Sequence, residues 1–225
     1  MQTLDTRITP HGDVDDRAYW ESYYAARKAP FAPSLFARYT FENNLKRGDS
    51  LIELGCGNGR DAIYFAEHGI RVDAVDQCAN EMDYLAKAYQ RDGLRFRAGD
   101  FTRLESGATF RHVYSRFTLH SISSERQVAL LKWIAAVLEP GGHFHLEARG
   151  KKNELYRRGD AVAGEPDAYI FEGHFRRFLD LDETCAALKF AGLHIVEAVE
   201  APGFSPFGDQ DETFIRIVAR RNPVR

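Results

Sequence analysis

Three glycines spaced two residues apart, Gly55, Gly57 and Gly59, are the feature of this sequence with the clearest chemical meaning. They follow residues 51–54, an apolar stretch typical of a buried strand, and precede residues 60–66, whose apolar side chains recur at helical spacing. Glycine has no β-carbon and adopts positive φ without strain, so such a turn lets the backbone approach a ligand closely. The pattern predicts a ligand-binding turn between a strand and a helix.

Two acids follow the turn at the ends of further predicted strands. Asp76 closes the apolar residues 72–75, where a carboxylate can accept hydrogen bonds from a pair of ribose hydroxyls. Asp100 and Phe101 follow residues 94–98, and a carboxylate beside an aromatic ring suits an exocyclic amine and the face of an adenine. Turn and acids together predict a nucleoside-binding half of an open α/β sheet.

The glycine spacing limits which nucleoside ligand the turn can bind. The dinucleotide fingerprint needs G-x-G-x-x-G, whereas this turn is G-x-G-x-G, and no phosphate loop of the G-x-x-x-x-G-K-[ST] type is present. A nicotinamide-binding turn, and a glycine loop without a ligand, stay open as alternatives.

Composition excludes several other classes. Net charge is −3, with 44% hydrophobic and 28% charged residues, so there is no basic field for nucleic acid or an anionic membrane. No apolar run is long enough to span a bilayer, and the N-terminus lacks the apolar stretch of a signal peptide. Three widely separated cysteines, Cys56, Cys78 and Cys185, predict neither disulfides nor a metal site, and they fit a reducing cytoplasm.

The string ELGCGNG of residues 53–59, with the acid at Asp76, resembles the first motifs of the class I S-adenosylmethionine-dependent methyltransferases. The resemblance is looser to small bacterial members of polysaccharide or natural-product pathways and to the tellurite-resistance type. It implies S-adenosyl-L-methionine as the cofactor. The residues expected at the cofactor are Glu53, Gly55, Gly57, Gly59, Asp76, Gln77, Asp100, Phe101 and Arg116.

The expected fold is a Rossmann-like seven-stranded α/β sheet, mostly parallel, with helices on both faces. Residues 193–199 and 213–219 are joined by a loop rather than a helix, so the last strand is expected to be antiparallel, as in the resembling family. Residues 1–49 are expected to form an N-terminal helical cap on a methyltransferase domain of residues 50–225. An insert at about 151–180 is long enough to shape an acceptor pocket.

Candidate acceptor residues lie near the carboxyl ends of the predicted strands, where ligands of open α/β sheets bind. His120 and His174 are the candidate general bases for an acceptor hydroxyl. Arg149 and Arg177 are candidates for holding an anionic acceptor, because a guanidinium binds carboxylate or phosphate bidentately. Tyr23, together with its neighbour Tyr24, is expected to face the cofactor and the acceptor from the cap.

The sequence therefore predicts an enzyme that methylates a small, anionic or sugar-like acceptor, most simply at oxygen by in-line displacement. It predicts no nucleic acid, membrane or metal partner, and leaves the oligomeric state open. A non-catalytic S-adenosylmethionine-binding partner protein and a nicotinamide-dependent oxidoreductase remain as alternatives. A partner protein is expected to have a damaged cofactor site, yet the three glycines, Asp76 and Asp100 are all in place.

Overall fold

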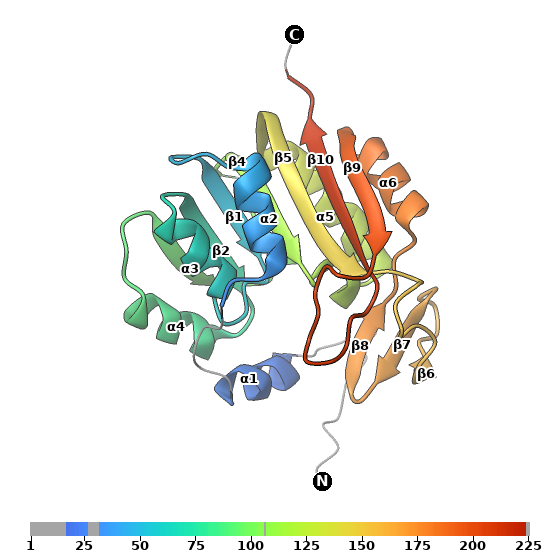
Figure 1. Cartoon of the computed structure of the whole chain (residues 1–225). Coiled ribbons are helices and arrows are strands. Elements are labelled where there is room, and N and C mark those ends of the chain that lie inside the picture. The colour runs from blue at the N-terminus through green and yellow to red at the C-terminus, as the bar shows by residue number, and fades with distance from the viewer. Residues whose placement is uncertain (1–16, 27–31, 106, 224–225) are drawn as a thin grey trace.

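The computed structural model describes residues 17–26, 32–105 and 107–223 (Figure 1). Parts of the expected cap, residues 1–16 and 27–31, lie outside the described residues. The described part of the expected cap contains two helices, α1 (Arg17–Ala25) and α2 (Leu35–Asn44). The side chain of Ser34 caps α2 by accepting a hydrogen bond from the Ala37 N–H.

A seven-stranded sheet forms the centre of the molecule, in the order β3-β2-β1-β4-β5-β10-β9. The first five of these strands are parallel neighbours, and β10 runs antiparallel to both β5 and β9. The Rossmann-like sheet and its reversed last strand are therefore confirmed. The strands are β1 (Ser50–Leu54), β2 (Arg71–Asp76), β3 (Leu94–Ala98), β4 (Phe110–Arg116), β5 (Leu138–Arg149), β9 (Leu193–Ala201) and β10 (Phe214–Arg221).

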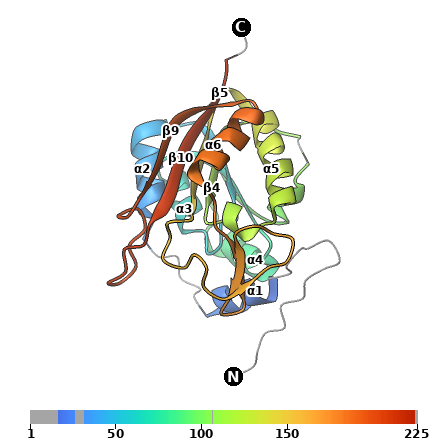
Figure 2. The same ribbon diagram turned by 90° about the vertical axis from the view of Figure 1, so that its right-hand side faces the viewer.

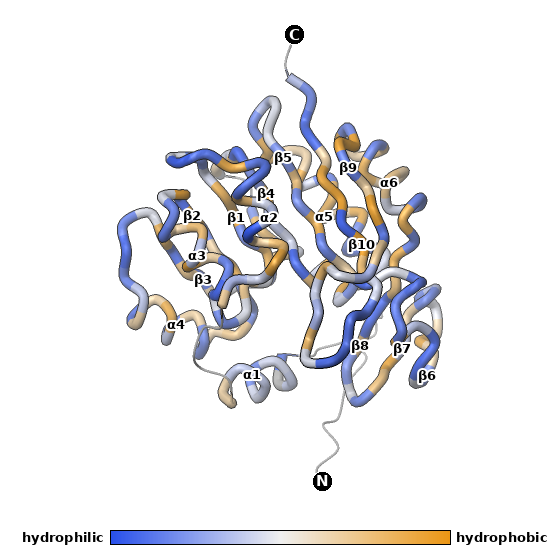
Figure 3. Tube along the Cα trace, viewed as in Figure 1, coloured by the Kyte–Doolittle hydropathy of each residue, from blue (hydrophilic) through white to orange (hydrophobic). Residues whose placement is uncertain are grey.

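Helices cover both faces of this sheet, as Figure 2 shows with the sheet seen nearly edge-on. One face carries α2, α3 (Arg60–Glu67) and α4 (Ala79–Ala88), and the other carries α5 (Ser124–Val137) and α6 (Leu181–Phe190). Each face has its own buried apolar cluster, and the orange stretches of Figure 3 follow the central strands and α5. None of the helices in the described ranges has the length and apolarity needed to cross a bilayer.

The insert folds as a small antiparallel sheet that the sequence did not predict. It consists of β6 (Asp160–Ala161), β7 (Ala168–Phe171) and β8 (His174–Arg177). The turn between β7 and β8 is Glu172-Gly173, with φ of 54° and 71°, as a two-residue type I′ hairpin turn requires. Asparagine or aspartate usually occupies the first of these positions, so glutamate there gave no clear hairpin signal.

A histidine relay lies on the α2 face of the sheet, toward the amino ends of β4 and β5. His112 Nε2 is 3.2 Å from the Asp49 carboxylate, and His112 Nδ1 is 3.1 Å from His145 Nε2. His112 therefore donates to Asp49 and accepts from His145, which leaves His145 Nδ1 unprotonated and without a partner in the described residues. Burial lowers the pKa of His112 to about 4 and that of His145 well below its ordinary value.

We expect this relay to make the protein acid-sensitive. Because the folded pKa values lie below the unfolded value of about 6.5, the folded chain binds fewer protons, and stability falls as the pH drops below about 6.5. His145→Gln is expected to reduce the slope of unfolding free energy against pH by about one proton, about 1.4 kcal/mol per pH unit near pH 5. Urea unfolding at several pH values measures this slope. The exposed His194→Gln is the control, and equal slopes for the two variants would contradict the assignment.

Candidate functional site

The glycine turn joins β1 to α3 in the conformation that its sequence requires. Gly55, Gly57 and Gly59 have φ of 70°, 54° and 74°. The Gly55 and Cys56 N–H groups donate to the Val75 carbonyl at 2.7 and 3.1 Å, which fixes the turn against β2. A β-carbon on Gly55 would lie 2.2 Å from Thr118 Cγ2, so only glycine fits there.

Asp76 fastens the turn from the end of β2. Its Oδ2 accepts from the Gly57 N–H at 2.9 Å, and its Oδ1 accepts from the Cys78 N–H at 3.0 Å. Burial raises the pKa of Asp76, while these backbone donors oppose the rise. A carboxylate oxygen accepts more than one hydrogen bond, so both oxygens retain capacity for a ligand. Gln77 follows at the carboxyl end of the same strand.

Glu53 is a buried acid at the carboxyl end of β1. Its Oε2 finds no hydrogen-bond partner among the residues that the structure describes. Burial, and then repulsion from Asp61, raises the pKa of Glu53 well above its ordinary value. An unpaired buried carboxylate oxygen costs free energy unless a ligand or a proton satisfies it. Glu53 is therefore ready to receive a donor from a ligand beside the turn.

Helix α1 reaches over the turn. A β-carbon added to Gly57 would lie 2.3 Å from the Tyr24 hydroxyl, so Tyr24 lies against the turn itself. Burial, and then the nearby Asp76 carboxylate, raises the pKa of Tyr24 well above its ordinary value. Tyr23 packs edge-on against the rings of Trp20 and Tyr24, at 5.5 and 5.2 Å between centroids. The cap therefore supplies an aromatic wall to this rim, and a binding role for Tyr23 remains a prediction.

Asp100 and Phe101 lie at the carboxyl end of β3. Asp100 caps the short 3₁₀ helix η1 (Phe101–Arg103), and its Oδ1 accepts from the N–H and hydroxyl of Thr102 at 2.9 and 2.7 Å. Its Oδ2 lies 3.4 Å from an Arg126 guanidinium nitrogen. The Phe101 ring lies 3.6 Å from the point where a Gly55 β-carbon would stand. Phe101 is thus beside the turn, as the sequence predicted.

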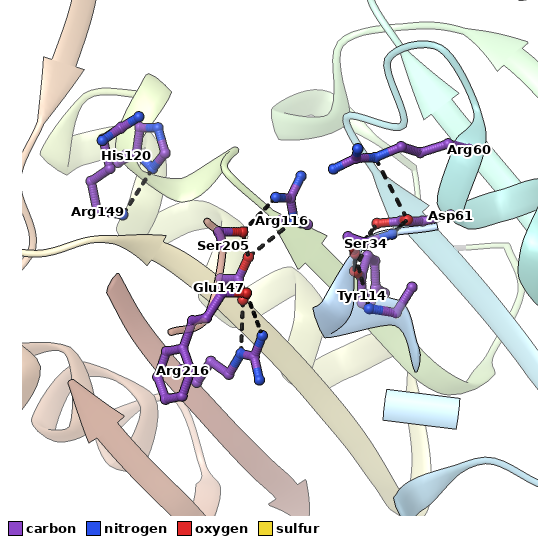
Figure 4. Close-up of polar contacts among 12 residues, drawn as sticks. Ser34, Arg60, Asp61, Tyr114, Arg116, His120, Glu147, Arg149, Ser205 and Arg216 are labelled. Carbon is purple, nitrogen blue, oxygen red and sulfur yellow. Dashed lines mark hydrogen bonds and ion pairs between the residues drawn. The ribbon is translucent and has the colours of Figure 1, made fainter. Parts of the chain in front are cut away.

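Arg116 has partners that the sequence did not predict. Its Nε donates to Glu147 Oε1 at 3.0 Å, and a second nitrogen donates to the Ser205 hydroxyl at 2.7 Å (Figure 4). Glu147 is fully buried and also accepts from Arg216 Nε at 2.7 Å. Arg116 therefore neutralises Glu147 at the end of β4. A contact of Arg116 with the cofactor remains a prediction.

The two candidate bases, His120 and His174, lie at the same rim. His120 belongs to the 3₁₀ helix η2 (Leu119–Ser121), and its Nδ1 accepts from the Arg149 N–H at 3.2 Å (Figure 4). Neutral His120 then carries its proton on Nε2 and is a donor. His174 begins β8 and stacks on Tyr19 at 5.0 Å between centroids. Burial lowers the pKa of His174 to about 3 and that of His120 well below its usual range, so both imidazoles are neutral.

The two candidate anion-binding arginines are both engaged. Arg149 pairs with Glu212 and donates to Asn153 Oδ1 at 2.8 Å. Arg177 is buried and donates to the carbonyls of Ile122 and Leu119 and to the Gln127 side chain. Arg177 therefore fastens the insert to the segment between η2 and α5. These contacts use Nε and one terminal nitrogen of Arg177, and its role in acceptor binding remains a prediction.

Sequence reasoning missed a polar network at the amino end of α3. Asp61 accepts from the N–H and hydroxyl of Ser34 at 2.8 and 2.7 Å and from the Tyr114 hydroxyl at 2.9 Å (Figure 4). It ties the start of α2 to the glycine turn and to β4. The two donors, Ser34 and Tyr114, come from distant segments and leave no local pattern, although an acid in the first turn of a helix is a recognisable signal.

Comparison with known proteins finds similarity in the half of the chain that contains the glycine turn, which we call the cofactor half. Residues 51–142 match the family model described as a methyltransferase domain, and they span β1 through the start of β5. The cypemycin N-terminal methyltransferase of a Streptomyces species is 35% identical over 116 residues, covering 51% of this chain and 47% of that protein. The S-adenosyl-L-methionine-dependent Diels-Alderase iccD of Talaromyces variabilis is 31% identical over 137 residues, covering 57% and 44%. The chain thus spans about half the length of these curated relatives.

The fold has solved counterparts over nearly its whole length. One is the 1,6-didemethyltoxoflavin-N1-methyltransferase of Burkholderia thailandensis, solved with 1,6-didemethyltoxoflavin and S-adenosylhomocysteine. It superposes with a TM-score of 0.69 at 22% identity, covering 98% of this chain and 94% of that one. At this identity the likeness establishes the fold.

Proposed function

We propose that this chain, whose residues 51–142 match the methyltransferase domain family, is an S-adenosylmethionine-dependent methyltransferase of a small anionic acceptor. The observation that carries the proposal is the glycine turn, whose glycines have positive φ and whose Gly57 N–H is bonded to Asp76, beside Glu53, whose Oε2 has no hydrogen-bond partner in the described residues. The acceptor rim adds neutral histidines, arginines and aromatic rings. We infer transfer to oxygen, with a sugar-like acceptor and a nitrogen atom as the competing cases.

The residues present fit the cofactor. The glycine turn lets a ligand approach the backbone closely, and the Asp76 carboxylate can accept further hydrogen bonds from ribose hydroxyls. Glu53 Oε2, without a partner in the described residues, can accept a hydrogen bond from an ammonium group. Asp100 and Phe101 offer an acceptor and a ring at the next strand end, where an adenine is expected. When bound, S-adenosylmethionine supplies an electrophilic sulfonium methyl group.

The chain itself contributes alignment and exclusion of water. Helix α1 closes over the turn with Tyr24, and η2 presents His120 next to Arg149. Holding two reactants in line supplies most of the catalysis when the electrophile is already activated. Burial, and then the charges of Arg176 and Arg149, lower the pKa of His174 to about 3, so it is a weak base that suits an acidic hydroxyl. An acidic oxygen therefore suits this site better than a sugar alcohol.

Removing each histidine tests its role. His174→Gln is expected to lower turnover by at most about 100-fold, the low end for a general base, because a pKa of about 3 makes it a weak one, with S-adenosylhomocysteine affinity within threefold of wild type. His120→Gln is expected to have a smaller effect, because neutral His120 is a donor. Production of S-adenosylhomocysteine from an acceptor found by screening is the readout. Wild-type turnover in both variants would mean that the acceptor enters already ionised.

Calorimetric titration with S-adenosylmethionine, S-adenosylhomocysteine and NAD tests the proposal as a whole. Micromolar binding of the first two and none of NAD is the expected result. Binding of NAD alone would overturn the proposal in favour of an oxidoreductase. Analysis of the methylated product then shows which acceptor atom received the methyl group. A methyl ester, a methyl ether and a methylamine differ in mass-spectrometric fragmentation and in stability to alkali.

A second candidate is an S-adenosylmethionine-dependent reaction that transfers no methyl group. The observation in its favour is the 31% identity to a protein named as a Diels-Alderase, together with two histidines that are not strong bases. Consumption of an acceptor without release of S-adenosylhomocysteine would favour this candidate. Binding of the cofactor with no reaction in any screen would favour a non-catalytic partner protein.

A further inference from the structure

Arg176 is the neighbour of Arg177 on β8 and points to the opposite face of that strand. Arg176 is half-buried on β8, and its guanidinium donates to two backbone carbonyls, those of Phe171 at 3.1 Å and His174 at 3.5 Å. No carboxylate lies within 4.0 Å of it in the described segments. Two hydrogen bonds from one terminal nitrogen leave the other guanidinium donors for a ligand.

Charges of both signs surround Arg176: that of Arg149, and those of the Glu172 and Glu212 carboxylates. Burial lowers the pKa of Arg176 most, the charge of Arg149 lowers it further, and the two carboxylates raise it. Arg149 is itself paired with Glu212. The charges of Arg149 and Arg176 also lower the pKa values of His120 and His174, and both imidazoles are neutral. Among the described residues Glu172 and Glu212 act on this half-buried guanidinium through charge alone and form no direct ion pair with it, so it can still take an anion, and its planar fork matches a carboxylate.

The walls beside Arg176 are flat and aromatic. In the register of β7 and β8, Tyr169 pairs with Arg176 and Phe171 with His174, so these four residues share one face of the small sheet. His174 in turn contacts the α1 rings of Tyr19, stacked at 5.0 Å, and Trp20, edge-on at 4.9 Å. Since Tyr24 of the same helix touches the glycine turn, α1 links this aromatic face to the cofactor half.

We propose that Arg176 anchors the carboxylate of a planar aromatic acid, which is the acceptor of the transfer proposed above. The inference rests on that proposed function, because it places the acid between β8 and α1 at the rim of the cofactor turn. Arg176 is a specificity-determining residue: it selects aromatic acids over their neutral amides. Arg177, on the opposite face of β8, fastens the insert instead.

Benzoate and benzamide are a matched pair of probes, since they share size and ring and differ in charge. The chain has two tryptophans, and Trp133→Phe leaves Trp20 as the reporter. Trp133 Nε1 has no acceptor in the described residues, so this background loses no hydrogen bond. Benzoate, titrated in the presence of saturating S-adenosylhomocysteine, is expected to change Trp20 fluorescence with millimolar affinity, and benzamide is expected to bind at least tenfold more weakly.

Arg176→Gln in this background is expected to weaken benzoate binding at least tenfold and to leave benzamide binding unchanged. Arg176→Lys should recover part of the loss, because it keeps the charge without the fork. Arg158→Gln, an exposed arginine of the same insert, is the control and is expected to bind benzoate like wild type. Thermal melting and S-adenosylhomocysteine affinity should not change in any of these variants.

The outcomes separate this inference from the function on which it rests. Failure of S-adenosylhomocysteine to bind would overturn the proposed function itself. Normal S-adenosylhomocysteine binding with equal affinities for benzoate and benzamide, with no benzoate binding, or with benzoate binding that survives Arg176→Gln would overturn the role of Arg176 alone.

Discussion

Replacing Glu147 with alanine is expected to lower the free energy of unfolding by about 3–5 kcal/mol, the usual cost of leaving buried charges without their partner. Glu147 has no exposed surface and receives Arg116 at 3.0 Å and Arg216 at 2.7 Å. Ser205 donates to the same carboxylate at 2.9 Å. Removing the Glu147 carboxylate leaves the guanidinium groups of Arg116 and Arg216 buried without their acceptor between β4, β5 and β10. Urea unfolding monitored by circular dichroism measures the loss.

Two control variants define the source of this effect. Arg95→Ala removes a guanidinium whose side chain is 66% exposed and which pairs with Asp73 at 2.7 Å. It should cost less than about 1 kcal/mol, because exposed pairs contribute little and Asp73 keeps Arg97. Arg216→Met should cost less than Glu147→Ala, since Glu147 then keeps Arg116 and Ser205. An unfolding free energy for Glu147→Ala within about 1 kcal/mol of wild type would show that the ion pairs of Glu147 with Arg116 and Arg216 do not stabilise the fold.

The cofactor half of the fold was predictable because its signals are local. An apolar strand, a glycine turn and a helical periodicity each occupy fewer than about twelve consecutive residues, and the acid of β2 follows at a regular distance. The reversed strand β10 was predictable for a topological reason, since a loop joins antiparallel neighbours directly. Residues whose placement depends only on these elements, such as Asp76 and Phe101, lie where the sequence put them.

The acceptor side was less predictable because its contacts join distant segments. Arg116 and Arg216 meet at Glu147 only through the pairing of β10 with β5, where Arg216 is in register with Glu147. Arg176 and Arg177 are adjacent in sequence, yet they point to opposite faces of β8, and only the strand itself assigns one to the rim and the other to the scaffold. An arginine within the apolar run of β10 was the one visible hint of a buried ion pair.

Asp76→Ala is expected to weaken S-adenosylhomocysteine binding at least 100-fold, about 2.7 kcal/mol, while the protein stays folded. The variant loses the acceptor of the Gly57 N–H, which holds the turn, and the charged acceptor proposed for the ribose hydroxyls. Asp76→Asn is expected to be intermediate, because its amide keeps one acceptor oxygen and turns an N–H donor toward another donor. Calorimetric titration measures both affinities.

The matched control for Asp76 is Asp73, another largely buried acid of the same strand. Asp73 pairs with Arg95 and Arg97 at 2.7 and 2.8 Å, away from the glycine turn. Asp73→Ala is therefore expected to lower stability and to leave S-adenosylhomocysteine affinity within threefold of wild type. If Asp76→Ala also stays within threefold, the glycine turn holds its ligand without this carboxylate, and the ribose contact must come from another residue. A selective loss in Asp76→Ala would instead tie the conformation of the turn and the recognition of the nucleoside to a single buried side chain.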